Sequence, residues 1–184
     1  MAKITKSLWK FGTREVVFAA IGAALYAVFA YATNMLQIPA AANVSIRPGV
    51  VIPLFFGVAF GPIVGFITGF LGNFLADLIS GYGIWPWWDL GNGLMGLIPG
   101  LIVHQMTTYR AGKDILLAEA MSLVGIVVGM GVAAVSEMWV SGMDFIAAMT
   151  ANFVPAFISN AINGLVLLPI IMVAYSAIVK RSGR

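Results

Sequence analysis

Long apolar stretches recur along almost the whole chain, and they constrain its fold more than any other feature. A stretch of roughly 20 such residues crosses the ~30 Å hydrocarbon core of a bilayer as a helix. Of the 184 residues, 61% are hydrophobic and 9% are charged, whereas a soluble domain carries about 25% charged residues. The sequence therefore predicts an all-α integral membrane protein, with residues 1–184 forming a single membrane domain and no separate soluble domain.

The apolar stretches predict a bundle of six transmembrane helices. Their approximate ranges are 15–34, 49–60, 62–80, 87–107, 115–138 and 148–178. The second range is short for a full crossing, and Gly61 and Pro62 separate it from the third, so this pair could also form a tight hairpin or a partly re-entrant element. The sixth range contains Pro155 and Pro169, which predict a tilt or a kink.

The basic residues predict the orientation of the bundle. With six spans and both termini in the cytoplasm, nine of the ten Lys and Arg residues fall on the cytoplasmic side, as the positive-inside rule requires. Only Arg47 falls outside, in the connection between the first two spans. The first apolar stretch is too long for a signal-peptide core and lacks a clear cleavage site, so we expect it to be retained as a helix. Because the membrane topology already accounts for the positions of the basic residues, no nucleic-acid partner is expected.

Polar side chains within the spans predict a binding cavity. Such groups are costly in lipid and generally face the bundle interior, a cavity or a partner. The predicted topology places nearly all of them in the outer half of the bundle, including Asn73 and Asn152, and the long connection at 35–49 adds more. An outward-facing cavity for a partly apolar, partly hydrogen-bonding small molecule is therefore expected. Its candidate substrate-binding residues are Asn34, Gln37, Asn43, Arg47, Asp77, Trp85, Trp87, Trp88, Asp89, Asn92, Glu137, Trp139, Asn160 and Asn163.

Each of these residues also has a simpler explanation. The segment SGYGIWPWWDLGNG, residues 80–93, holds three tryptophans, and tryptophans often form an interfacial belt. A single Asn in a membrane helix more often bonds to a neighbouring helix than to a ligand. Clustering with Asp89, Asn92 and Glu137 at similar depth favours the cavity for the group as a whole.

Small residues recur at a spacing of four in two spans, which places them on one helix face. The third span has Gly61, Gly65 and Gly69, and the first has Ala19, Ala23 and Ala27 with Ala20 and Ala24 beside them. Faces of this kind let helices approach closely. Packing within the bundle is the preferred interpretation for the glycines. For the alanines, internal packing and docking to another membrane subunit both stay open.

The sequence does not present an arrangement typical of catalysis. The single histidine, His104, lies far from the outer polar residues, and there is no Ser/His pair, His-x-x-x-His pattern or G-x-x-x-x-G-K-[ST] phosphate loop. The chain has no cysteine, which excludes disulfides and thiolate metal sites. We expect no enzyme, no metal and no cofactor. A membrane enzyme is a minor alternative, because Asp77, Asp89 and Glu137 are carboxylates at similar depth that could bind a metal. Without a convincing inverted repeat, the chain is also small for a self-contained transporter.

Residues 60–101 contain a G-P-x-x-G-F stretch, an Asp that follows it, a Trp-Trp pair and a G-N-G-x-x-G-x-x-x-G helix. In these motifs they resemble a branch of the S components, the substrate-binding membrane subunits of energy-coupling factor (ECF) vitamin transporters. The six expected spans and the Ala-x-x-x-Ala stripe extend the resemblance to the whole chain.

The resemblance implies a non-catalytic subunit in the cell membrane of a prokaryote, which binds a vitamin from the outer side. Its implied partners are a transmembrane coupling subunit of the EcfT type and two ATPase subunits, on which it docks and topples to release cargo inward. The family's docking contact carries over to Ala19, Ala23 and Ala27, with Ala20 and Ala24, and its ligand-covering loop to residues 35–48.

The resemblance leaves the substrate open. The branch has been linked to cobalamin and to the hydroxymethylpyrimidine precursor of thiamine. The abundant outer Asn, Gln and Trp residues favour cobalamin, with the pyrimidine or thiamine group and other vitamins as alternatives. A solitary permease is the alternative from another class, and it predicts a continuous polar path through the bundle.

Overall fold

Helices make up nearly all of the computed structural model, which describes residues 8–33 and 47–181. No strand occurs within these two ranges, so the all-α prediction is confirmed there. The helices are α1 (Thr13–Thr33), α2 (Val51–Phe60), α3 (Pro62–Ser80), α4 (Pro86–Gly100), α5 (Gly112–Val140), α6 (Phe145–Ala147) and α7 (Val154–Arg181). A 3-10 turn, Pro48–Val50, precedes α2, another, Val103–Gln105, follows α4, and a π-helix, Ala148–Phe153, joins α6 to α7.

Helices occupy all six of the ranges expected to span the membrane. By length and composition, four are long and apolar enough to cross it, namely α1, α3, α5 and the continuous stretch Phe145–Lys180. α2 and its preceding turn cover only Pro48–Phe60, and α4 has 15 residues. The number of crossings and the side on which the termini lie therefore stay predictions.

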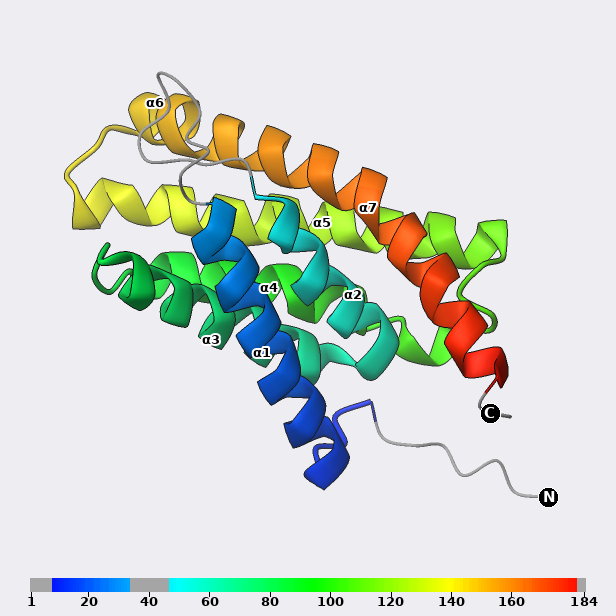
Figure 1. Cartoon of the computed structure of the whole chain (residues 1–184). Helices are drawn as coiled ribbons and strands as arrows, with labels where there is room; N and C mark the ends of the chain where they lie inside the picture. The colour runs from blue at the N-terminus through cyan, green and yellow to red at the C-terminus, as the bar shows by residue number, and fades with distance from the viewer. Residues whose placement is uncertain (1–7, 34–46, 182–184) are drawn as a thin grey trace.

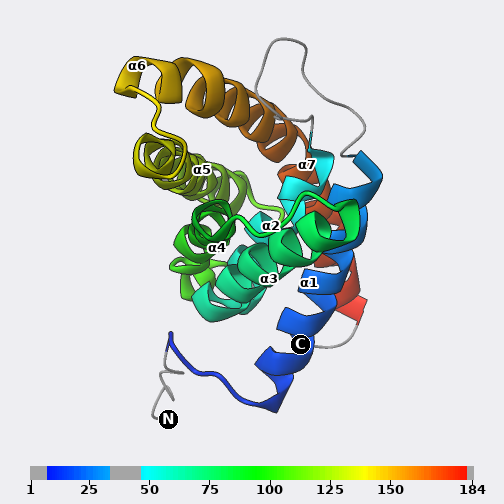
Figure 2. The ribbon, with the colours of Figure 1, turned by 90° about the vertical axis from the view of Figure 1, so that its left-hand side faces the viewer.

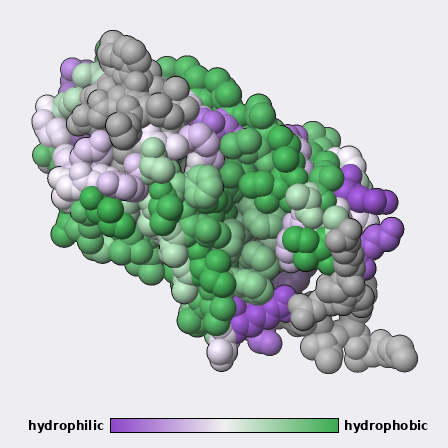
Figure 3. All heavy atoms as spheres, in the orientation of Figure 1, coloured by the Kyte–Doolittle hydropathy of each residue, from purple (hydrophilic) through white to green (hydrophobic). Residues whose placement is uncertain are grey.

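The helix ends gather toward two opposite ends of the molecule (Figure 1). The start of α1, the start of α5 and the end of α7 lie toward one end of the molecule, and the end of α3 and the end of α5 lie toward the other. α4 packs between α3 and α5, and α1 covers α3 (Figure 2). Hydrophobic residues dominate the surface between the two more polar ends (Figure 3).

The end of α4 differs from the prediction. The expected range continued to residue 107, but the helix ends at Gly100. Pro99 lies in its last turn and has no N–H to donate to the carbonyl of Met95, and Gly100 adds backbone freedom, so the helix is weakened at this point. The proline also leaves the Met95 carbonyl without that intrahelical hydrogen bond. This carbonyl faces α5, where a Cβ on Gly125 would be 2.8 Å from its oxygen.

Glycines bring the backbones of α2, α3 and α4 into direct contact. A Cβ at Gly65 of α3 would overlap the carbonyl oxygen of Gly96 of α4, and a Cβ at Gly57 of α2 would overlap the same oxygen. One turn along α3, a Cβ at Gly69 would overlap the carbonyl of Asn92. The packing interpretation of the glycine stripe is therefore confirmed at Gly65 and Gly69.

The alanine stripe of α1 also packs inside the bundle. Ala19, Ala23 and Ala27 are buried, and α1 lies against α3, where a Cβ on Gly72 would be 3.0 Å from the Ala23 carbonyl. The expectation that these three alanines form an external docking face is wrong for this conformation, since their side of the helix is covered. Ala20 and Ala24, on the other side, are exposed.

The glycine contacts predict a sharp difference between two small substitutions. Gly96→Ala should lower the free energy of unfolding by at least the ~1–3 kcal/mol typical of overpacking, because its Cβ would press on the α3 backbone. Gly131→Ala in α5 is the matched control, because nothing lies within 4 Å of its Cβ position. Thermal unfolding in detergent measures both, and equal midpoints would show that the close approach of α3 and α4 is not needed.

Candidate functional site

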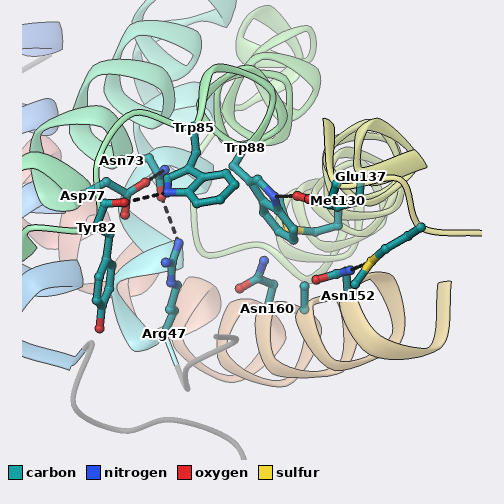
Figure 4. A pocket seen from close by; sticks show the side chains of 13 residues that line it. Arg47, Asn73, Asp77, Tyr82, Trp85, Trp88, Met130, Glu137, Asn152 and Asn160 are labelled. Atoms are coloured by element: carbon teal, nitrogen blue, oxygen red, sulfur yellow. Dashed lines mark hydrogen bonds between the residues drawn. The ribbon is translucent and has the colours of Figure 1, made fainter. Parts of the chain in front are cut away.

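A cavity of about 320 Å³ lies at the end of the bundle where α3 ends and α4 begins (Figure 4). Its volume is at the lower end of the ~300–1,000 Å³ range of small-molecule sites. The lining is polar and aromatic, with side chains from α3, α4, α5, the π-helix, α7 and their connections. The lining residues are Arg47, Asn73, Asp77, Tyr82, Trp85, Trp88, Met130, Glu137, Ser141, Met143, Asn152, Ala156 and Asn160.

Asn73 is the centre of a buried hydrogen-bond network on one wall. Its Nδ2 donates to Asp77 Oδ2 and to Asp89 Oδ1, each at 2.9 Å. Its Oδ1 accepts from Arg47 Nη1, also at 2.9 Å. The amide therefore holds a guanidinium and two carboxylates, from α3 and α4, at a single point. Buried charges need such partners to be tolerated.

Glu137 occupies the opposite wall, near the end of α5. Its Oε1 accepts from Trp88 Nε1 at 2.7 Å, and its Oε2 accepts from the Ser141 hydroxyl. These bonds fix the carboxylate and the indole ring of Trp88 relative to each other. A carboxylate oxygen has more than one lone pair, so Glu137 can still accept a hydrogen bond from a ligand.

Two asparagine amides face the cavity with weak partners. Asn152 Nδ2 contacts Met143 Sδ at 3.3 Å, and Asn160 Nδ2 contacts Met95 Sδ at 4.0 Å. A thioether sulfur is a weak acceptor, so a ligand that accepts or donates hydrogen bonds would be a better partner. Both residues are buried, and a buried amide without a good hydrogen-bond partner costs free energy that a ligand could recover.

An aromatic rim comes from the connection between α3 and α4. Gly81 and Gly83 have φ values of 73° and 88°, which allow the chain to turn back, and α4 then begins at Pro86. Trp85 Nε1 donates to the Tyr82 carbonyl at 2.9 Å, which holds the turn. Tyr82 and Trp85 are partly exposed and Trp88 is more buried, so aromatic rings line the cavity from its mouth to its interior.

The structure brings six of the fourteen candidate residues together in the cavity lining. These are Arg47, Asp77, Trp85, Trp88, Glu137 and Asn160. Asp89 and Asn92 do not line it but lie behind its wall, 1% and 2% exposed, where Asp89 binds Asn73 and Asn92 accepts from the Tyr26 hydroxyl at 2.7 Å. The expectation that they face the cavity is wrong, because they bind other helices.

Three further candidates do not line the cavity. Trp87 and Trp139 are 39% and 58% exposed and pack edge to face with ring centroids 5.4 Å apart. This exposed pair is consistent with the alternative interpretation of the tryptophans as an interfacial belt. Asn163 Nδ2 donates to the Ser159 carbonyl one turn earlier in its own helix, at 2.8 Å. Asn34, Gln37 and Asn43 fall outside the described residues.

Several lining residues were absent from the candidate set. Asn73 lies four residues before Asp77, on the same helix face, and this spacing is a signal that the sequence did contain. Met130, Ser141, Met143 and Ala156 line the cavity without a chemical signature. They join it because α5, the π-helix and α7 pack around it, which sequence patterns do not reveal.

The arrangement is suited to recognition by hydrogen bonds and ring contacts. Within residues 8–33 and 47–181, no three His, Asp or Glu side chains gather as a metal site would require.

Comparison with known proteins identifies the family of the chain. The profile of the family described as "ECF-type riboflavin transporter, S component" matches residues 10–177. The chain belongs to this family. It is thus an S component, which is a membrane transporter subunit, and the resemblance in residues 60–101 is confirmed.

Individual relatives cover much of the S component. A UPF0397 protein of Vibrio vulnificus (strain YJ016) is 40% identical over 127 residues, which are 66% of this chain and 68% of that one. A UPF0397 protein of Streptococcus pneumoniae (strain Hungary19A-6) is 30% identical over 178 residues, 95% of this chain and 96% of that one. The solved structure of ThiT from Listeria monocytogenes has a similar fold, with a TM-score of 0.56, 13% identity and coverage of 92% of this chain and 98% of that one.

The buried network predicts an unequal response to two Asn→Leu substitutions. Asn73→Leu should lower the free energy of unfolding by several kcal/mol, because each buried group left without its partner costs about 1–3 kcal/mol, and more if charged. Asn163→Leu is the control, since its amide bonds only within α7. The two thermal midpoints in detergent check this, and a milder effect at Asn73 than at Asn163 would refute the network's role.

Proposed function

We propose that this S component binds a small vitamin with a flat heteroaromatic ring in the cavity and delivers it inward with ATP-driven partners. The observation that carries the proposal is the cavity itself, where Trp88 and Glu137 are fixed to each other and where Asn152 and Asn160 contact only sulfur atoms within residues 8–33 and 47–181. A flat ring can stack on the indoles, while its nitrogen and oxygen atoms bind the amides and the carboxylate.

The size of the cavity argues against cobalamin, which the polar composition favours. A corrin macrocycle with its side arms needs a wide mouth, and about 320 Å³ lies at the small end of ligand sites. A riboflavin-sized or thiamine-sized molecule is a better match to the volume. The family's description names riboflavin, which supports this class of substrate without selecting one member.

The energising partners are proposed from the family. We infer a transmembrane coupling subunit of the EcfT type and two ATPase subunits in a prokaryotic cell membrane. The exposed side of α1 is the proposed docking face, because small side chains there lie among large apolar ones. Its residues are Val17, Ala20, Ile21, Ala24, Leu25 and Val28, all exposed.

A solitary permease is the weaker alternative. It needs a polar path between the two ends of the bundle. Among the described residues, most buried polar groups lie around the cavity, whereas Asp114 is held by the connection at the opposite end and the side chains of Thr68 and Ser122 are buried without a hydrogen-bond partner. Unpaired hydroxyls of this kind do not make a continuous path.

Ligand affinity should depend on one tryptophan and not on another. Trp88→Leu should weaken binding of the vitamin by at least roughly tenfold, because an aromatic contact is worth about 0.5–1.5 kcal/mol beyond its area and Glu137 also loses a donor. Trp139→Leu, outside the lining, should change the dissociation constant less than about twofold. Calorimetric titration of both purified variants checks this, and equal effects would place the ligand elsewhere.

Uptake should require the energising module. Cells that express the S component alone should not accumulate the vitamin, and cells that also express the coupling and ATPase subunits should. Ala24→Trp should abolish this uptake, because a bulky ring would obstruct the proposed docking face, yet leave the affinity of the purified subunit unchanged. Accumulation without the module would instead support the permease.

A further inference from the structure

A second cavity, of about 720 Å³, lies between the connection that follows α4 and the last turns of α7. It is at the end of the molecule opposite the vitamin cavity, where strongly hydrophilic residues gather (Figure 3). Arg110 of the connection and Lys180 of α7 both line it. The proposed function uses neither residue.

The connection beside this cavity is held in a defined shape. Asp114, 3% exposed, accepts at Oδ2 from the backbone N–H groups of Thr107, Thr108 and Tyr109, at 3.1, 2.7 and 3.0 Å. The hydroxyls of Thr107 and Thr108 also donate to this carboxylate. Because local donors surround it, the negative charge of Asp114 is already compensated within the connection.

Tyr109 fixes the connection to α7. Its φ of 60° is unusual for a residue other than glycine, a conformation that persists only where its surroundings hold it. Its ring packs edge to face on Tyr175 of α7, with centroids 5.1 Å apart. Burial, the neighbouring Tyr175 and Asp114 raise the pKa of Tyr109 to about 12, so it stays neutral. This contact joins the connection that carries Arg110 to the helix that carries Lys180.

The chemistry of the cavity is amphipathic. Neither Arg110 nor Lys180 has an ion-pair partner in the part of the chain that the structure describes. Val173 and Ala177 form an exposed apolar wall along α7 below them. Positive charge at the membrane boundary above an apolar helix surface matches a phospholipid, whose phosphate is anionic and whose chains are apolar, and basic pockets between transmembrane helices bind such headgroups.

We propose that this cavity binds the phosphate headgroup of an anionic phospholipid through Arg110 and Lys180, with an acyl chain against α7. The site would hold the end of α7 at the surface of the leaflet that this end faces. It stands on different residues from the vitamin cavity, so either proposal can fail without the other.

The test measures binding of phosphatidylglycerol to the purified full-length protein in detergent by native mass spectrometry. Phosphatidylcholine, which carries no net charge, is the control lipid. The wild type should retain phosphatidylglycerol preferentially. Arg110→Gln with Lys180→Gln should weaken this binding by roughly 30-fold, the equivalent of about 1 kcal/mol for each charge. Lys10→Gln with Lys113→Gln is the matched control, since both lysines are exposed and neither lines the cavity.

Three results would overturn the proposal. One is an equal loss in the control pair, which would indicate general attraction to a basic surface. Another is competition by inorganic phosphate at the concentration of the lipid, which would indicate a free-phosphate site. The third is loss of binding in Arg110→Lys with Lys180→Arg, which keeps both charges. Should the double Gln variant not fold, each single variant should weaken binding by roughly fivefold.

Discussion

The fold depends on the direct contact of the α3 and α4 backbones. Gly65 faces the Gly96 carbonyl and Gly69 faces the Asn92 carbonyl, so the two helices approach more closely than any larger side chain would allow. One turn beyond Gly69, the same geometry brings Asn73 within 2.9 Å of Asp89. The glycines therefore position the hydrogen-bond network that forms one wall of the cavity, and Arg47 completes it from the start of the turn before α2.

This arrangement explains how an apolar bundle can hold charged groups near a binding site. Two carboxylates and a guanidinium share a single amide, and a third carboxylate, on Glu137, is held by Trp88 and Ser141. Buried groups that have satisfied each other are rigid. Among the described residues, Asn152 and Asn160 have only sulfur contacts, so under the proposed function these two amides are where a ligand would gain most.

The sequence revealed the helical class, the family and the half of the bundle that holds the cavity, because apolar length, charge distribution and the motifs of residues 60–101 are local properties. It did not separate the groups that line the cavity from those behind its wall. Asp89 and Asn92 differ from Asp77 and Asn160 only in which helix they face, which tertiary packing decides. The alanine stripe shows the same limit, since the pattern at Ala19, Ala23 and Ala27 suits an internal and an external partner equally, and α3 covers it.

The proposed function requires that the isolated subunit holds a small heteroaromatic vitamin in this cavity. The most direct test is a co-crystal or cryo-electron microscopy structure of the purified subunit, prepared with the vitamin that binds most tightly in a panel including riboflavin, thiamine and cobalamin. We expect one planar molecule that contacts Trp88, Asn152 and Asn160. Cobalamin as the tightest ligand, or a ligand bound outside this lining, would contradict the proposed function.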